Sequence, residues 1–307
     1  MAITLEACIL ILKEHHILKS SAIQDNLTQR FENASYDSQT VQPKSIFFCK
    51  GAEFRPTYVQ EAKDKGAICY VAEQPYAEGN GMHALIVRNI RKAMALLAQD
   101  FYGYPQDELF VIAYTGTKGK TTASYFTRGI LDQMNDQHTA LFSTVDTVIG
   151  REATDTFKSP LTTSESLDLF RNMRTAVDNG MTELVMEVSS QAYKESRVFG
   201  LTYDVGIFLN ISPDHIGPRE HPNFADYLHC KMQLLVNSRK CIINAETDYF
   251  DQVYAAATAT TEPDIIYLYA SDAFEAPEDL KIDFRYRSEE ADLAQSRFKL
   301  KADSLKA

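Results

Sequence analysis

The residues best suited to chemistry lie in one short glycine-rich stretch, residues 115–122, with the sequence Thr-Gly-Thr-Lys-Gly-Lys-Thr-Thr. An apolar run of strand length, residues 109–114, comes directly before it. A helical pattern over residues 121–134 comes directly after it. A glycine-rich turn between a buried strand and a helix is the setting in which proteins bind phosphate groups, so this stretch predicts a nucleotide site.

Each part of this phosphate loop has a chemical role. Gly116 and Gly119 allow the backbone to wrap a phosphate with its N–H groups. Lys120 can neutralise the β- and γ-phosphates, and the Thr121 hydroxyl can bind Mg²⁺. The strict form of the pattern begins with a further glycine, and Tyr114 stands at that position here. The alternative interpretation is an ordinary glycine-rich turn between a strand and a helix.

Further polar clusters follow predicted strands, at the edge where open α/β sheets place their ligands. Thr163 and Ser164 precede a helix, where they could bind a ligand or cap the helix. Glu187 ends an apolar run, and a carboxylate there could bind Mg²⁺ opposite the loop threonine or could simply be solvated. Asp214 and His215 could form a general base, a metal site or a loop cap.

One lysine completes the set of candidates. Lys231 lies in a predicted helix over residues 224–235, whose apolar face consists of Tyr227, Met232, Leu234 and Leu235. A single lysine on such a helix is ordinarily a solvated side chain. Its place in the order of the motifs allows a second interpretation of Lys231, as a residue of the site.

The elements that position these residues alternate between strands and helices. Residues 45–49, 67–72 and 84–87 are expected strands, and residues 58–65 and 90–101 are expected helices. We expect a small N-terminal α/β domain over residues 1–105 and a P-loop-type domain over residues 106–307. The second is expected to be a doubly wound, mostly parallel sheet with helices on both faces.

Composition excludes several classes of protein. The chain has 307 residues, a formal net charge of −11 and 45% apolar residues. This charge disfavours binding to nucleic acid or anionic membranes, and the apolar content is ample for a core. No apolar run is long enough for membrane insertion, and no secretory signal is evident, so we expect a cytoplasmic protein. The five cysteines form no CxxC pair and read as reduced and mostly buried: Cys8, Cys49, Cys69, Cys230 and Cys241.

Taken together, the order of these motifs resembles the Mur ligase family, and within it the branch that adds the third amino acid of the peptidoglycan stem peptide. The resemblance covers essentially the whole chain, including Asp37-Ser38 near the first predicted strand. The ordered set is far more specific than any one motif: residues 116–122, Thr162 and Thr163, residues 187–190, Arg197, Asn210, Asp214 and His215, and Lys231.

The resemblance implies a role for each matching residue. ATP would bind to the loop residues Gly116, Thr117, Lys118, Gly119, Lys120, Thr121 and Thr122. Thr121 and Glu187 would bind one Mg²⁺, and His215 a second, bridged by Lys231 carbamylated on its amine. The catalytic residues would be Lys120, His215 and Lys231. The nucleotide-sugar substrate would contact Ser38, Thr162, Thr163, Ser189 and Arg197.

The activity implied is an ATP-driven amide ligation. UDP-MurNAc-L-Ala-D-Glu would be activated as an acyl phosphate, and the amine of L-lysine would then displace phosphate. Lys118, Leu161 and Glu195 depart from the commoner family pattern, and the segment before Lys231 is longer than usual. These departures favour the Gram-positive type of enzyme that adds lysine.

The chain is also shorter than family members, which carry a third domain. We therefore expect a fragment that retains the nucleotide-sugar platform and much of the ATP site but is inactive alone. Three alternatives remain: the homologue that adds meso-diaminopimelate, another ligase such as folylpolyglutamate synthase or the D-glutamate-adding enzyme, and a non-catalytic P-loop module that binds nucleotide only.

Overall fold

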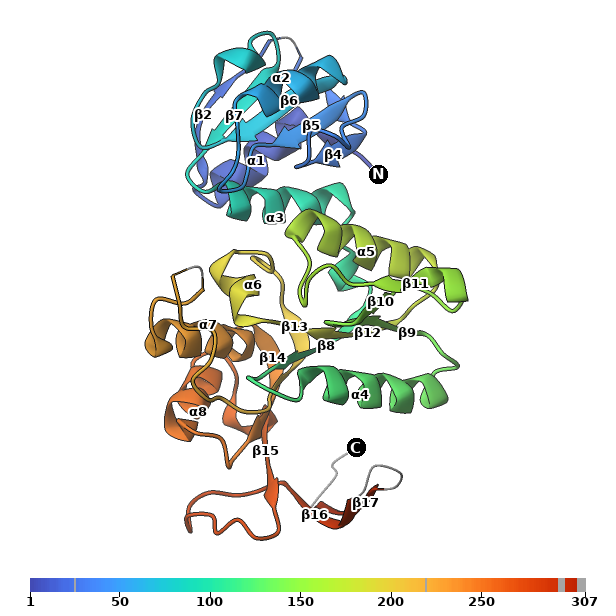
Figure 1. Cartoon of the computed structure of the whole chain (residues 1–307), viewed down its shortest axis with the longest axis vertical. Helices are drawn as coiled ribbons and strands as arrows, with labels where there is room; N and C mark the ends of the chain where they lie inside the picture. The colour runs from blue at the N-terminus through green and yellow to red at the C-terminus, as the bar shows by residue number, and fades with distance from the viewer. Residues whose placement is uncertain (25, 219, 292–295, 303–307) are drawn as a thin grey trace. The chain divides into compact units, whose positions relative to one another are not determined.

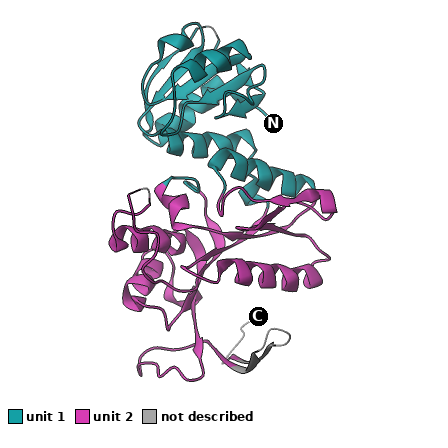
Figure 2. Cartoon of the chain, in the orientation of Figure 1, with its two compact units in different colours: residues 1–108, 164–179, 195–200 teal, residues 109–163, 180–194, 201–307 magenta. Residues whose placement is uncertain are grey.

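A computed structural model describes residues 1–24, 26–218, 220–291 and 296–302. The chain forms two compact units, coloured separately in Figure 2. The first unit comprises residues 1–108, 164–179 and 195–200, and the second comprises residues 109–163, 180–194 and 201–307. The first unit thus contains two segments that lie beyond the boundary expected at residue 105.

The first unit contains a five-stranded sheet in the order β2-β7-β6-β5-β4. The pair β2–β7 is antiparallel and the other pairs are parallel. The three strands expected from sequence are β5, β6 and β7 (Figure 1). The strands of this unit are β1 (Ile3–Thr4), β2 (Leu18–Ala22), β3 (Arg30–Phe31), β4 (Asn33–Ser35), β5 (Ser45–Phe48), β6 (Ala67–Ala72) and β7 (His83–Val87).

The α-helices in the described part of this unit are α1 (Leu5–Glu14), α2 (Thr57–Asp64), α3 (Ile90–Phe101) and α5 (Ser166–Asp178). α3 begins where the Asn89 side chain accepts a hydrogen bond from the backbone of Lys92 at 2.9 Å, a standard N-cap. The apolar residues of α3 are buried, and the helix packs on α5. α1 was not expected from the sequence.

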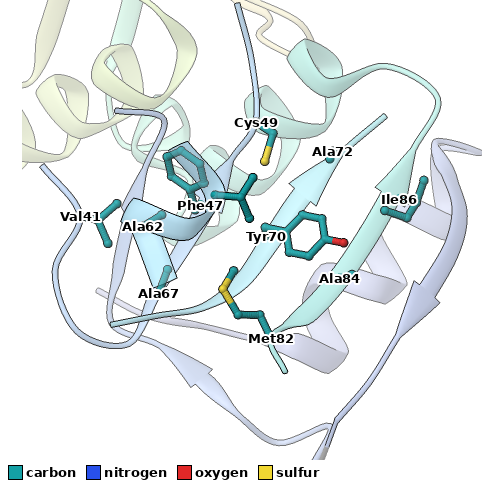
Figure 3. Packing of buried hydrophobic residues seen from close by; sticks show 11 residues of the cluster. Val41, Phe47, Cys49, Ala62, Ala67, Tyr70, Ala72, Met82, Ala84 and Ile86 are labelled. Atoms are coloured by element: carbon teal, nitrogen blue, oxygen red, sulfur yellow. The ribbon is translucent and has the colours of Figure 1, made fainter. Parts of the chain in front are cut away.

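The core of this sheet forms from apolar side chains on β5, β6 and β7 together with α2. Figure 3 shows Phe47, Tyr70 and Met82 in this cluster, and all three side chains are buried. Small residues lie among them, such as Ala62 of α2, and allow the helix to approach the sheet closely.

The second unit is built on a ten-stranded sheet in the order β11-β10-β9-β12-β8-β13-β14-β15-β16-β17. The pairs from β9 to β16 are parallel, which confirms the expected mostly parallel α/β architecture. Antiparallel pairs occur at both ends, β9–β10–β11 and β16–β17. The strands are β8 (Phe110–Thr115), β9 (Thr139–Phe142), β10 (Asp146–Val148), β11 (Thr156–Lys158), β12 (Glu183–Glu187), β13 (Tyr203–Phe208), β14 (Ser238–Asn244), β15 (Ile266–Ser271), β16 (Phe284–Ala291) and β17 (Ser296–Ala302).

The helices of the second unit are α4 (Lys120–Met134), α6 (Ser190–Lys194), α7 (Phe224–Val236) and α8 (Phe250–Thr258). α4 packs on β8, β9 and β12. α7 packs on β13 and β14 and contacts both α6 and α8 (Figure 1). The carboxyl ends of β8, β12 and β13 therefore lie side by side, and the residues that follow them form the candidate site.

Two other expectations concern the whole chain. All five cysteines are free and buried, as expected for reduced thiols. Within the residues that the structure describes, no helix has the length and apolar character needed to cross a membrane.

Candidate functional site

The phosphate loop joins the carboxyl end of β8 to the first residue of α4, as the sequence predicts. Gly119 precedes the helix with a φ of +86°, a conformation that side chains disfavour and glycine adopts freely. Ala113, Tyr114 and Thr115 at the end of β8 are buried, so the loop is built on a fixed support.

Asn210, which follows β13, holds the loop in shape. Its side-chain oxygen accepts hydrogen bonds from the backbone N–H of Thr117 at 3.1 Å and of Lys118 at 3.0 Å. Its side-chain nitrogen donates to the Lys118 carbonyl at 3.0 Å. The Thr117 hydroxyl accepts from the backbone N–H of Ser212 at 3.0 Å. The loop is therefore bound to the neighbouring strand end at several points.

Two lysines converge on one carbonyl of the loop. Lys120 Nζ donates to the Gly116 carbonyl oxygen at 2.9 Å, and Lys231 Nζ donates to the same oxygen at 2.6 Å. Burial lowers the pKa of Lys120. Burial, and then the nearby Lys120 ammonium, lower the pKa of Lys231 to about 7. The two amines thus lie close together on one carbonyl oxygen, where an anionic ligand would be attracted to both.

The Lys231 side chain is buried, although a single lysine on such a helix is ordinarily solvated. It is 2% exposed, on the side of α7 that faces the loop. Its Nζ lies 4.8 Å from the centre of the Tyr227 ring, one turn earlier in the helix. The apolar face assigned from the sequence was wrong in this respect, because the lysine lies inside and Met232 is only half-buried.

Glu187 lies at the end of β12 with no exposed surface. Its carboxylate accepts from Thr144, at 2.9 Å from the backbone N–H and at 3.0 Å from the hydroxyl. The Thr162 hydroxyl lies 3.1 Å from the Thr144 hydroxyl and can donate to it, because Thr144 gives its single hydroxyl proton to Glu187. The interpretation of Glu187 as a solvated strand-end acid is therefore wrong. The Glu187 carboxylate also lies near enough to Lys120 for the two charges to attract each other.

Thr163 and Ser189 are also brought together. The Thr163 hydroxyl donates to the Glu187 carbonyl at 3.1 Å and accepts from the Ser189 backbone N–H at 3.0 Å. The two hydroxyl oxygens are 3.4 Å apart. Three predicted residues, Thr162, Thr163 and Ser189, thus surround the end of β12 with Glu187.

His215 lies in the loop between β13 and α7, half-exposed and with a φ of +53°. Its Nδ1 is 2.9 Å from a Glu220 carboxylate oxygen, and its ring centre is 6.0 Å from that of Tyr227. The Tyr227 hydroxyl lies 3.1 Å from the Thr117 hydroxyl. Tyr227 therefore lies next to His215, to Lys231 and to Thr117 of the phosphate loop.

A buried histidine anchors this loop to α7. His221 is fully buried, and its Nδ1 lies 2.6 Å from a carboxylate oxygen of Asp226 in the first turn of the helix. Its backbone N–H donates to the His215 carbonyl at 3.0 Å. This pair holds the segment that carries His215.

The predicted residues Ser38 and Arg197 belong to the first unit. Ser38 is buried, donates to a Glu61 carboxylate at 2.7 Å, and lines a hollow of about 460 Å³ together with Tyr36, Lys50 and Phe54. This hollow has the aromatic and polar lining that suits a planar ring with hydrogen-bonding groups.

Arg197 and Lys50 both bind the carboxylate of Glu165, at 3.2 Å and 2.8 Å. All three side chains are mostly buried. Burial alone would raise the pKa of Glu165, but Lys50 and then Arg197 outweigh it and hold the pKa below its usual value. These two cations on one buried acid leave a net positive charge suited to an anionic ligand.

The donor set at the strand ends fits a hard divalent cation. Thr121 and Glu187 offer a hydroxyl and a carboxylate, the oxygen ligands that Mg²⁺ prefers, whereas the His215 imidazole is a softer ligand. Lys231 fits only if its amine is converted into an anionic group. Burial lowers the pKa of this amine and so favours its neutral form, which is the form that reacts with carbon dioxide.

Three residues of the site were not identified as such from the sequence. Thr144 was given no role, Tyr227 was assigned only to the core, and Asn210 was not identified as the residue that shapes the loop. Asn210 had a usable signal, because it follows a strand directly and an amide can bond to both kinds of backbone group. Thr144 had none, since no motif surrounds it.

The chain matches one protein family and is similar to several known proteins. The Mur ligase middle domain matches residues 114–304. The UDP-N-acetylmuramyl-tripeptide synthetase of Lactobacillus delbrueckii subsp. bulgaricus is 69% identical over 309 residues, covering 100% of this chain and 60% of that protein. The UDP-N-acetylmuramoyl-L-alanyl-D-glutamate–L-lysine ligase of Enterococcus faecalis is 51% identical over 246 residues, covering 80% of this chain and 48% of that protein.

A solved structure of a UDP-N-acetylmuramoyl-L-alanyl-D-glutamate–2,6-diaminopimelate ligase has the same fold. Its TM-score is 0.73 at 21% identity, covering 99% of this chain and 58% of that one. The chain thus spans about 60% of the length of the relatives that it matches.

Proposed function

The chain belongs to the Mur ligase family, and from this premise we propose that it forms the nucleotide-binding and acceptor-binding part of an ATP-dependent amide ligase. The proposed reaction of the whole protein joins L-lysine to UDP-MurNAc-L-Ala-D-Glu. The Enterococcus faecalis relative is an L-lysine ligase, which supports lysine as the amino acid. The proposed setting is the cytoplasm, where peptidoglycan precursors are made.

The observation that carries this proposal is the convergence of Lys120 and Lys231 on the Gly116 carbonyl. A phosphate loop needs one such lysine, and a second, buried on another helix, indicates a further task at the same place. We assign Lys120 to the ATP phosphates. Amide formation from a carboxylate and ATP brings two anions together, so cationic groups at this point would lower their repulsion.

We assign Lys231, in its carbamylated form, to a metal together with His215, and Thr121 and Glu187 to another. Addition of carbon dioxide to the neutral amine forms an N–C bond and releases one proton, which leaves a carboxylate in place of an ammonium group. Mg²⁺ bound there would supply Lewis-acid stabilisation of the phosphates. The Glu187 carboxylate is kept in one orientation by its two bonds to Thr144.

The proposed reaction has two steps. The terminal carboxylate of the acceptor attacks the γ-phosphorus, the bond to ADP breaks, and an acyl phosphate forms. The amine of lysine then attacks the acyl carbon, and inorganic phosphate leaves as the amide forms. The phosphate loop, shaped by Asn210, would hold the triphosphate in place during the first step.

We propose that Thr162, Thr163 and Ser189 of the second unit contact the acceptor, whereas roles for Ser38 and Arg197 of the first unit stay predictions from the family resemblance. Calorimetric titration of UDP-MurNAc-L-Ala-D-Glu into this chain tests the assignment. We expect saturable binding that Thr162→Ala weakens by roughly tenfold, the effect of losing one hydrogen bond to a charged or buried group.

Thr258→Ala is the matched control, because that threonine lies on α8 and its hydroxyl bonds only within the helix. It should leave binding unchanged. A folded protein that binds ATP but not the acceptor would overturn the ligase assignment and favour a module that binds nucleotide only.

A further inference from the structure

A group of potential metal ligands, none of which has a part in the proposed reaction, lies where the loop after β13 meets α7. The His221 ring, the Asp226 carboxylate and the Cys230 thiol each offer one ligand atom, and these three atoms lie within 4.8 Å of one another. Among the residues that the structure describes, no other group of three or more histidine, cysteine, aspartate and glutamate side chains converges in this way.

One helix and the loop before it bring the three side chains together. Asp226 and Cys230 are four residues apart in α7, so they lie on the same side of the helix, one turn apart. The Asn223 side chain caps the helix and accepts from the Asp226 backbone N–H at 2.9 Å. His221 comes from the loop, and its ring packs edge-on against Tyr227 with 5.2 Å between the ring centres. Both the helix start and the imidazole are therefore held in place.

The imidazole of His221 has an unusual environment. The side chain has no exposed surface, and its Nδ1 lies 2.6 Å from a carboxylate oxygen of Asp226. Its Nε2 is buried and has no hydrogen-bond partner within the described part of the chain. Buried polar atoms are nearly always paired, so this nitrogen points to a ligand at the ring. A cation can bind Nε2 while Asp226 orients the ring, or Nδ1 in place of the proton shared with Asp226.

The thiol lies close to the same acid. Burial, and then the nearby Asp226 carboxylate, raise the pKa of Cys230 to about 11, and the Lys194 ammonium acts in the opposite direction. The thiol is therefore protonated in the chain alone, and a cation that binds sulfur has to displace this proton into water. A thiolate, a carboxylate and a neutral imidazole then carry two negative charges, which balance a divalent cation.

The three side chains select a class of cation. Mg²⁺ and Ca²⁺ prefer oxygen ligands, whereas zinc and cobalt(II) bind imidazole and thiolate well. We propose that His221, Asp226 and Cys230 form a binding site for a divalent transition-metal cation of the zinc type, with water as the fourth ligand.

The geometry needs only a small adjustment. Zinc holds nitrogen and oxygen at about 2.0–2.2 Å and sulfur at about 2.3 Å in a tetrahedron, so its ligand atoms are roughly 3.4–3.6 Å apart. The ligand atoms here lie within 4.8 Å of one another, with His221 and Asp226 in contact at 2.6 Å. The Asp226 side chain is 36% exposed, so it can rotate to widen this contact, and it leaves an opening for the cation and its water.

A cation at this site would tie the loop to α7. The His221 backbone N–H donates to the His215 carbonyl at 3.0 Å, and the His221 carbonyl accepts from the Gly217 N–H at 3.0 Å. The ligand residue is thus bonded directly to the part of the loop that carries His215. The cation would stabilise this loop without taking part in the proposed reaction.

Cobalt(II) is the probe, because a cobalt–thiolate bond absorbs in the near ultraviolet by charge transfer, which oxygen and imidazole ligands do not reproduce. The chain is dialysed against a chelator and then titrated with Co²⁺ in the presence of excess Mg²⁺. We expect the absorption to saturate at one equivalent. Added Zn²⁺ should remove it, since zinc favours a tetrahedral site with sulfur.

Variants of the ligands test the assignment. Cys230→Ser should abolish the absorption. Asp226→Asn should weaken Co²⁺ binding by at least about tenfold, the cost of losing even an outer partner of a metal ligand. Asp226 is half-exposed, so this variant remains informative if loss of the buried thiol impairs folding. Cys49→Ala is the matched control, because it also removes a buried free thiol, and it should leave the absorption unchanged.

A folded chain without the absorption, or absorption that persists in Cys230→Ser, would overturn the proposal. His215→Asn separates this site from the proposed Mg²⁺ site, and asparagine tolerates the φ of +53° at that position. It should leave the absorption unchanged, and its loss would place the ion in the Mg²⁺ site and also overturn the proposal.

Thermal denaturation provides a second readout. Zn²⁺ should raise the melting temperature of this chain but not that of Cys230→Ser, because a ligand that binds only the folded state stabilises it. Equal shifts in both would contradict a site that contains the thiol. Neither measurement uses catalytic activity, so its outcome is independent of the proposed reaction.

Discussion

At the scale of single residues, the phosphate loop contains two lysines with different surroundings. Lys120 is half-buried against the Gly116 carbonyl, whereas Lys118 is exposed and its backbone is held by Asn210. We expect Lys120→Ala to weaken ATP binding between about 10- and 100-fold, because a hydrogen bond to a charged group contributes roughly 1.5–3 kcal/mol. Calorimetry with a non-hydrolysable ATP analogue measures this change.

Lys118→Ala is the control within the same loop and should change the affinity little. If the two variants weakened binding equally, the loop would attract phosphate by general charge rather than through Lys120.

Asn210 provides a second prediction at this scale. Asn210→Ala removes two bonds to the loop N–H groups and one to the Lys118 carbonyl. We expect the affinity for ATP to fall by about tenfold and the free energy of unfolding to fall by roughly 1–3 kcal/mol. Titration and urea denaturation of the same sample measure both. An unchanged ATP affinity would show that the loop keeps its shape without Asn210.

Some properties of these single residues could be predicted from the sequence, and others could not. The places of Lys120, Glu187 and His215 at or after the ends of β8, β12 and β13 could be predicted, because apolar runs mark these strands, whereas the roles of the three residues stay predictions. The burial of Lys231 could not, since it depends on how α7 lies against a loop that is distant in sequence. The bonds of Thr144 to Glu187 likewise arise only from folding.

At the scale of elements, two glycines of the same region should respond oppositely to alanine. Gly119 has a φ of +86°, and an added Cβ would meet Leu209 only at an ordinary contact distance of 3.7 Å, so Gly119→Ala should cost about 1–2 kcal/mol through its backbone conformation. Gly129 lies inside α4 with open space around its Cα, so Gly129→Ala should add about 0.5–1 kcal/mol to the free energy of unfolding. Urea denaturation followed by circular dichroism compares the two, and a destabilising Gly129→Ala would contradict this account.

Elements were predicted best where pattern and packing agree. Strands β5, β6 and β8 read as continuous apolar runs because both of their faces are covered. β10 and β11 were missed, since they are short, and β11 is exposed along its whole length. The exposure of Phe126, Ile130 and Met134 on α4 could not be predicted either, because an amphipathic pattern does not state which surface is covered.

At the scale of the whole molecule, every cysteine is buried and free. Burial raises the pKa of all five thiols, to about 11 for Cys230 and Cys241 and further for the others. At pH 8 the native protein should therefore react very slowly with a thiol reagent such as dithionitrobenzoate. Five thiols should react after denaturation, and reducing agent should leave the melting temperature unchanged. Rapid reaction of one thiol in the native state would reveal local opening around it.

The bonds that hold the phosphate loop also have a consequence for kinetics. Thr117 and Lys118 are bound to Asn210 and Ser212 by hydrogen bonds within the chain itself, so these bonds and not nucleotide contacts fix the shape of the loop. The loop therefore does not need to order itself when a nucleotide arrives, and little conformational entropy is lost in that step. In a stopped-flow experiment, the observed association rate should rise in proportion to nucleotide concentration and show no plateau. Asn210→Ala should introduce a plateau, because encounter would then be followed by a separate ordering step.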